Sequence, residues 1–215
     1  MNEDENLRLH YLELLGISVW QQIDVVPLIN PEAGNLDVTL QNVQGKQSQL
    51  AATEQQVIWG EGDLHADWFV VIDWSTRQEN NSEGALLESN EGLLINEILR
   101  ALKLSRDTVF MTYLVKCPPF SAAPLSAELI QCYEYLQQQI LLIKPKMLLV
   151  LGEFAAQTLL KTPTSLIQLR GKVFDYSNIP VVVSFSPAHL LSDCLMKRAV
   201  WNDLQLALKT LQKKE

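Results

Sequence analysis

The chain has 215 residues, of which 47% are hydrophobic and 20% are charged, and its formal net charge is −8. This composition excludes a disordered or collagen-like protein, and the length suits one domain with an appendage better than two full domains. Phosphate binding depends on lysine and arginine, so the acidic balance predicts little direct binding of DNA. An acidic N-terminus and the lack of long apolar runs predict a cytoplasmic protein without a membrane span.

An N-terminal arm, residues 1–30, is predicted ahead of the folded domain. Tyr11, Leu14 and Leu15 recur at the spacing of one helix face. Gly16 stands where a left-handed residue would end that helix. A helix this short is marginal alone in water, so its apolar face must pack either on its own domain or in the groove of a partner.

The rest of the chain divides into a connector and a core. Residues 31–56 contain proline, glycine and many side-chain amides without a sustained period, and they predict a connector. Residues 57–215 alternate between continuous apolar runs and amphipathic segments, which predicts an α/β domain. Strands are expected at 68–72, 109–115, 147–151 and 181–185, and helices at 91–102, 127–143, 153–160 and 195–211. Continuous apolar strands separated by helices predict a three-layer sandwich with a central parallel four-stranded sheet.

Ligands of such sheets bind beyond the carboxyl ends of the strands. The side chains at these ends are therefore the first candidates for a functional site. They are Asp73, Trp74, Tyr113, Ser186 and His189.

Five segments, in order along the chain, resemble family-4 uracil-DNA glycosylases. They are VIWGEGD at 57–63, MTYLVKCPP at 111–119, LVLGEFAA at 149–156, RGK at 170–172 and FSPAHLL at 185–191. The resemblance covers the chain from about residue 57 to residue 211 and implies a uracil-DNA glycosylase-like fold. Fold alone does not supply function, so each functional position of that family needs to be compared.

The resemblance implies a degenerate glycosylase pocket with no catalytic residues. The family's glycine-rich acidic loop falls on Asp73 and Trp74, where an indole fills space that a close backbone approach needs empty. The family's uracil-reading asparagine falls on Tyr113, whose phenol cannot present an amide's paired donor and acceptor. The family's histidine falls on Ser186, a neutral donor. His189 stands three residues later, at the family's tyrosine.

The sequence predicts no metal and no cofactor. The family's iron–sulfur cluster has four cysteine ligands, of which only Cys117 and Cys132 have counterparts, and four are required. These two are interpreted as partly buried thiols, with a zinc site completed by histidines as the alternative. The remaining cysteine, Cys194, lies apart from both. The acidic segment from Glu61 to Asp67 is interpreted as a solvated loop.

The arm supplied the functional hypothesis. Residues 9–20, LHYLELLGISVW, resemble the opening of the psi subunit of the bacterial DNA polymerase III clamp loader. That resemblance implies a non-catalytic psi subunit whose arm docks on the tau/gamma subunits and whose folded domain pairs with chi, which contacts single-strand-binding protein. The implied docking residues are Tyr11, Leu14, Leu15, Ile17 and Trp20.

Two alternatives stay open at this point. One is an atypical uracil-DNA glycosylase of base-excision repair, in which Asp73, Ser186 or His189 carries the chemistry. The other is an unrelated scaffold or regulator. Uracil release from DNA by the purified protein distinguishes the first alternative from the rest.

Overall fold

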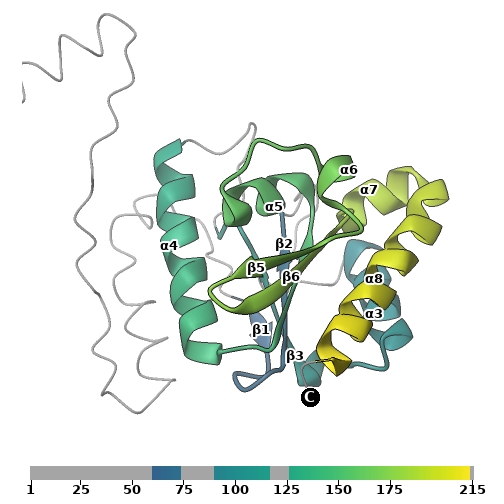
Figure 1. The fold of residues 1–215 in the computed structure, drawn as a ribbon, viewed down its shortest axis with the longest axis horizontal. Helices are drawn as coiled ribbons and strands as arrows, with labels where there is room; N and C mark the ends of the chain where they lie inside the picture. Colours follow the sequence, from purple (N-terminus) through teal and green to yellow (C-terminus); the bar gives the residue numbers. More distant parts are fainter. Residues whose placement is uncertain (1–59, 74–89, 117–125, 214–215) are drawn as a thin grey trace, which may run out of the picture. The chain divides into compact units, whose positions relative to one another are not determined.

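The computed structural model describes residues 60–73, 90–116 and 126–213, and every structural statement below concerns them. The predicted arm and connector lie outside this range. Figure 1 shows a central sheet with helices packed on both of its faces. The strands are β1 (Glu61–Gly62), β2 (Trp68–Ile72), β3 (Val109–Tyr113), β4 (Met147–Leu151), β5 (Val173–Tyr176) and β6 (Ile179–Ser184). The helices are α3 (Asn90–Ala101), α4 (Ser126–Ile143), α5 (Glu153–Leu160), α6 (Leu166–Leu169), α7 (Pro187–Ser192) and α8 (Lys197–Gln212), with 3-10 turns η1 (Arg106–Thr108) and η2 (Cys194–Met196).

The sheet has the strand order β1-β3-β2-β4-β6-β5. The four inner strands are parallel, and Trp68 of β2 lies level with Val109 of β3 and Met147 of β4. Two short strands, β1 and β5, close the edges in the antiparallel sense. The prediction of four strands is therefore wrong in number. It missed both edges because β1 has two residues and β5 alternates between exposed and half-buried positions, so neither forms a continuous apolar run.

Burial of both sheet faces explains the three layers. Every residue of β2, β3 and β4 is buried, which requires a helical layer on each side. Figure 1 shows α4 on one side of the sheet and α3 and α8 on the other. The ammonium of Lys161, just after α5, lies 5.8 Å from the centre of the Tyr133 ring of α4, so these two helices are neighbours. On the other side α3 contacts α7, and α8 covers β6.

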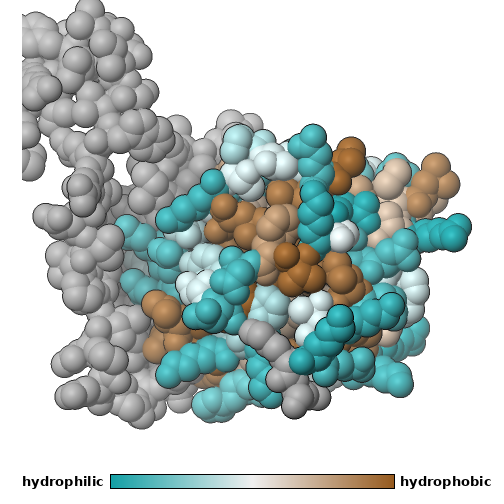
Figure 2. Space-filling view, viewed as in Figure 1, coloured by the Kyte–Doolittle hydropathy of each residue, from teal (hydrophilic) through white to brown (hydrophobic). Residues whose placement is uncertain are grey.

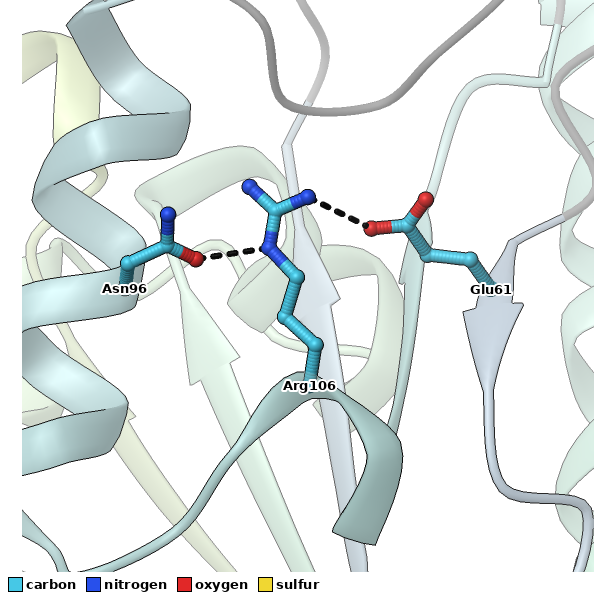
Figure 3. Close-up of polar contacts among 3 residues, drawn as sticks. All are labelled: Glu61, Asn96 and Arg106. Carbon is cyan, nitrogen blue, oxygen red and sulfur yellow. Dashed lines mark hydrogen bonds and ion pairs between the residues drawn. The ribbon is translucent and has the colours of Figure 1, made fainter.

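Edge strand β1 is held by a polar link at the amino end of β3. Figure 3 shows Arg106 of η1 between two partners: its Nε donates to Oδ1 of Asn96 at 2.6 Å, and its Nη1 lies 3.5 Å from Oε1 of Glu61. The backbones approach closely here, because a Cβ on Gly62 would lie 1.9 Å from the carbonyl oxygen of Val109. This link lies at the end of β3 opposite to the one where ligands are expected.

The surface is mixed in character. Figure 2 shows hydrophobic side chains gathered between polar ones on the face that carries β5 and α6. Ile167 of α6 and Val173 of β5 are among the exposed apolar residues, at 78% and 42%. Among the described helices, none combines the length and the apolar character that crossing a membrane requires.

Candidate functional site

The carboxyl ends of β2, β4 and β6 place three sequence positions along one edge of the sheet. Asp73 follows β2, Gly152 follows β4, and Ser186 comes two residues after the end of β6. Neighbouring strands lie about 4.8 Å apart, so the backbones of Asp73 and Ser186 are separated by two strand spacings, about 10 Å. A glycine between two polar side chains leaves the middle of this edge without a side chain. These three positions, together with His189, are the candidate site.

Asp73 is fixed to the first turn of α5. Its Oδ1 accepts a hydrogen bond from the backbone N–H of Ala155 at 2.5 Å. Its backbone continues the sheet, donating to the carbonyl of Leu151 at 3.2 Å and accepting from the N–H of Val115 at 3.4 Å. Burial raises the pKa of the Asp73 carboxyl to about 6, against the opposing effect of the amides at the start of α5. The group is therefore a carboxylate at neutral pH and a stronger base than an exposed aspartate.

Gly152 is required by the position of Asp73. A Cβ on Gly152 would lie 2.1 Å from the carboxyl carbon of Asp73, well inside van der Waals contact. Its φ of 133° also lies in a region that residues with a side chain rarely adopt. The residue therefore allows the strand end and the Asp73 carboxylate to approach each other closely.

Ser186 and His189 lie together at the start of α7. The Ser186 Oγ accepts the backbone N–H of His189 at 3.3 Å and so caps the helix, with Pro187 in its first turn. The Oγ is an acceptor in this bond, so its own hydrogen remains available to an acceptor on a ligand. The His189 imidazole is exposed, and it stacks on Phe185 with ring centres 4.8 Å apart and planes inclined by 11°.

Other predicted pocket residues have different positions. Tyr113 ends β3 and is 2% exposed, so its phenol belongs to the hydrophobic core. Trp74 and the predicted docking residues of the arm lie outside the described residues. The strand order brings Asp73, Ser186 and His189 to one edge of the sheet.

Three ionisable residues near this edge were not predicted from the sequence as functional candidates. Arg170 and Asp203 form a buried ion pair beneath Phe185, at 2.7 Å. A signal for Asp203 was present, because it shares the buried stripe of α8 with Val200 and Leu204, where a lone carboxylate requires a partner. Lys116, three residues beyond β3, is fully buried, and its Nζ donates to Thr112 Oγ1 and, at 2.8 Å, to Gln139 Oε1.

The described residues do not fit an iron–sulfur cluster. The Cys132 Sγ is buried and accepts the backbone N–H of Lys116 at 3.4 Å, whereas Cys194 is exposed on η2. The whole sequence contains three cysteines, fewer than the four ligands of such a cluster. Within the described part of the chain, no three histidine, cysteine or acidic residues are grouped so as to hold a metal ion. We therefore derive no chemistry through a metal.

Comparison with known proteins decides the family. The family model of the uracil DNA glycosylase superfamily matches residues 59–205, which include β2 to β6 and the whole candidate site. The chain belongs to the uracil DNA glycosylase superfamily. It is 29% identical to the type-4 uracil-DNA glycosylase of Thermotoga maritima over 77% of this chain and 88% of that protein. The type-4 enzymes of Saccharolobus solfataricus (28%; 84% of this chain and 88% of that protein) and Archaeoglobus fulgidus (26%; 72% and 82%) are similar over comparable lengths.

These relatives overturn the hypothesis of a non-catalytic psi subunit. The prediction that the chain is not an enzyme is wrong, and so is its assignment to the polymerase III clamp loader with tau/gamma and chi as partners and little direct contact with DNA. The psi resemblance depended on 12 arm residues, whereas the superfamily match spans residues 59–205.

Proposed function

We propose that this protein is a uracil-DNA glycosylase that hydrolyses the bond between uracil and deoxyribose in DNA. The observation that carries the proposal is a half-buried carboxylate, Asp73, held across a glycine from the hydroxyl of Ser186 and the imidazole of His189, on the scaffold of a glycosylase superfamily. The names of the type-4 relatives give the substrate class.

The reaction assigns distinct roles to the two sides of the site. A water oxygen bonds to C1′ of the deoxyribose, the C1′–N1 bond breaks, and uracil leaves with the bonding electron pair. The Asp73 carboxylate orients this water and takes its proton. Proton transfer is most effective when the pKa of the base lies near the working pH, and burial places Asp73 close to that range.

Ser186 and His189 face the departing base. Negative charge develops on the uracil oxygens as the bond breaks, and preorganised donors lower the energy of that charge. The Ser186 hydroxyl, with its oxygen oriented by the His189 N–H, is one donor. A ring nitrogen of His189 is the other. These two donors take the place that the resemblance assigns to a histidine at position 186.

The strong negative charge of the chain makes DNA binding dependent on local basic groups. Lys197 and Arg198 are exposed at the start of α8, a few residues beyond His189. Their contacts with phosphate release counterions, so we expect uracil release at low substrate concentration to fall steeply as salt is raised.

The test is uracil release from single-stranded and double-stranded DNA containing one labelled uracil. The wild type is expected to yield free uracil and an alkali-sensitive abasic site. Asp73→Asn keeps the shape and the bond from Ala155 but removes the base, so release is expected to fall by about 10²-fold to 10⁴-fold. Asp175→Asn, which alters an exposed carboxylate on β5, is the matched control and keeps the wild-type rate.

Two outcomes contradict the proposal. One is a folded wild-type protein that releases no uracil from either form of DNA. The other is release that persists unchanged in Asp73→Asn and in Ser186→Ala with His189→Ala, because these groups would then take no part in the reaction.

A further inference from the structure

A half-buried arginine and a buried aspartate form an ion pair next to Phe185. Asp203 of α8 is 2% exposed, and its Oδ2 accepts from Arg170 Nε at 2.7 Å and from Ser184 Oγ at 2.6 Å. The Arg170 Nη2 also lies 2.7 Å from the same oxygen. Arg170 directly follows α6 and Ser184 ends β6, so one carboxylate oxygen links these two elements to α8.

The guanidinium of this pair continues into an aromatic stack. Arg170 lies over the Phe185 ring at 4.4 Å from its centre, and the His189 ring stacks on Phe185 at 4.8 Å. Both groups therefore contact the same phenyl ring. The contacts therefore run without a break from Asp203 through Arg170 and Phe185 to His189.

Burial changes sharply along this series of contacts. Asp203 and Phe185 are buried, Arg170 is half-buried, and only His189 is exposed. A buried ion pair adds little net stability compared with apolar residues of the same volume. The ion pair instead fixes the orientation of the guanidinium. Two of its nitrogens are held by Asp203, and the planar group lies over the Phe185 ring.

We propose that Arg170 and Asp203 are positioning residues that hold the Phe185 ring, and through it the His189 imidazole, in the orientation used at the candidate site. The inference rests on the proposed function for the role of His189. The backbone of His189 is held separately by Ser186, so this series of contacts controls the side chain rather than the helix. Loss of the ion pair is therefore expected to release the imidazole while α7 keeps its place.

The first test is spectroscopic and needs no substrate. The chain has three histidines, His10, His65 and His189, so the His189 ring signals are assigned by single substitution. Stacking on Phe185 places the His189 ring protons upfield of those of an unstacked histidine. Arg170→Met and Asp203→Asn are expected to remove most of that upfield shift. Phe185→Leu, which keeps an apolar side chain, removes it entirely.

A matched control tests whether the effect is specific to the Arg170–Phe185 contact or common to any contact between a cation and an aromatic ring. Lys161 lies over the Tyr133 ring on the other side of the sheet, with no link to His189. Lys161→Met is expected to leave both the His189 shift and uracil release at wild-type values. Arg170→Lys keeps the charge opposite Asp203 but loses the planar face, so it is expected to give an intermediate shift.

The second test is kinetic. A misplaced imidazole affects the transition state more than ground-state binding, so Arg170→Met is expected to lower kcat by about tenfold to 100-fold with KM changed by less than about twofold. Arg170→Lys is expected to recover part of the loss. Thermal unfolding of each variant, measured in parallel, shows that the comparison is made between folded proteins.

The outcomes distinguish this inference from the proposed function. An unchanged His189 shift in folded Arg170→Met and Asp203→Asn overturns the positioning role whatever the activity. Equal losses of kcat in Lys161→Met and Arg170→Met overturn it as well. If the wild type releases no uracil but the shifts change as expected, the proposed function fails and the described contacts to His189 are supported.

Discussion

Asp73 and Lys116 follow neighbouring strands of the sheet, and burial moves the pKa of both toward neutrality from opposite directions. The pKa of the Asp73 carboxyl rises to about 6, and that of the Lys116 ammonium falls to about 7. Asp73 is half-buried at the end of β2, whereas Lys116 has no exposed surface. A shifted pKa alone therefore does not identify a reacting group, because a substrate must also reach it.

The hydrogen-bond partners of Asp73 and Lys116 also differ in whether they favour the charged form. The Asp73 carboxylate receives backbone N–H groups at the start of α5, which favour its charged form. The Lys116 Nζ donates to a hydroxyl and a side-chain amide, Thr112 and Gln139, which are neutral acceptors. The first environment maintains a charge that is available for chemistry. The environment of Lys116 disfavours the protonated ammonium, and its hydrogen bonds join β3 to α4.

The largest effect is expected where the Asp73 environment is disrupted through its glycine. Gly152→Ala places a methyl group against the Asp73 carboxyl and forces alanine to a φ of 133°. We expect uracil release to fall by at least about 100-fold through displacement of the base. The free energy of unfolding should fall by about 2–3 kcal/mol from backbone strain and overlap. Both are measured on one preparation, by uracil release and by urea denaturation.

Gly62→Ala is the control for this prediction. Its Cβ would overlap the Val109 carbonyl just as severely, at 1.9 Å and a φ of 114°, but at the opposite end of β3. A similar loss of stability is expected, with wild-type release by the molecules that remain folded. Equal losses of activity in the two variants would show that strain anywhere in the sheet, rather than Asp73, limits the reaction.

The next largest effect concerns Lys116 and the pH dependence of stability. Its pKa is lower in the folded chain than in the unfolded chain, so between about pH 7 and 10.5 the unfolded chain binds more protons. The wild type should therefore gain on the order of 3 kcal/mol from this group between pH 7 and 9.5. Lys116→Met should lose that gain, whereas Lys209→Met, on the exposed face of α8, should keep it.

Urea denaturation at the two pH values measures the difference directly. A slope that is the same in the wild type and in Lys116→Met would mean that Lys116 keeps its proton inside the fold. In that case a counter-charge near Lys116 would compensate for burial, and the contrast with Asp73 would disappear.

The inner part of the fold was predictable because its signals are local. Residues 68–72 and 147–151 are continuous apolar runs bounded by polar residues or glycine, and both strands match the prediction to the residue. The helix at 153–160 was also correct. Helix α7 was missed although Ser186 before Pro187 is a typical helix start, because its six residues are too few to show a helical period. Strand β5 depends on pairing with β6, which its own four residues do not reveal.

The candidate site was only partly predictable. Asp73, Ser186 and His189 were identified because each follows a predicted strand, a rule that needs no coordinates. Their interpretation as a degenerate pocket stays a prediction, whereas the conclusion that the chain is not an enzyme was wrong. The contact between Gly152 and Asp73 joins residues 79 positions apart in the sequence. The contact between Arg170 and Asp203 joins residues 33 positions apart. No local pattern encodes such contacts.

The last prediction tests whether Asp73 serves as a buried base or as a helix cap. Its pKa is higher in the folded chain, so the folded state binds the proton more tightly, and stability falls as pH rises from about 4 to 6. Asp73→Asn has no charge to bury and still accepts the Ala155 N–H. We therefore expect it to be more stable than the wild type at pH 7.5 by about 3 kcal/mol, with the difference vanishing below pH 4. Should the variant be less stable at pH 7.5, the amides of α5 outweigh burial, and Asp73 serves the fold as a cap more than it serves the reaction as a base.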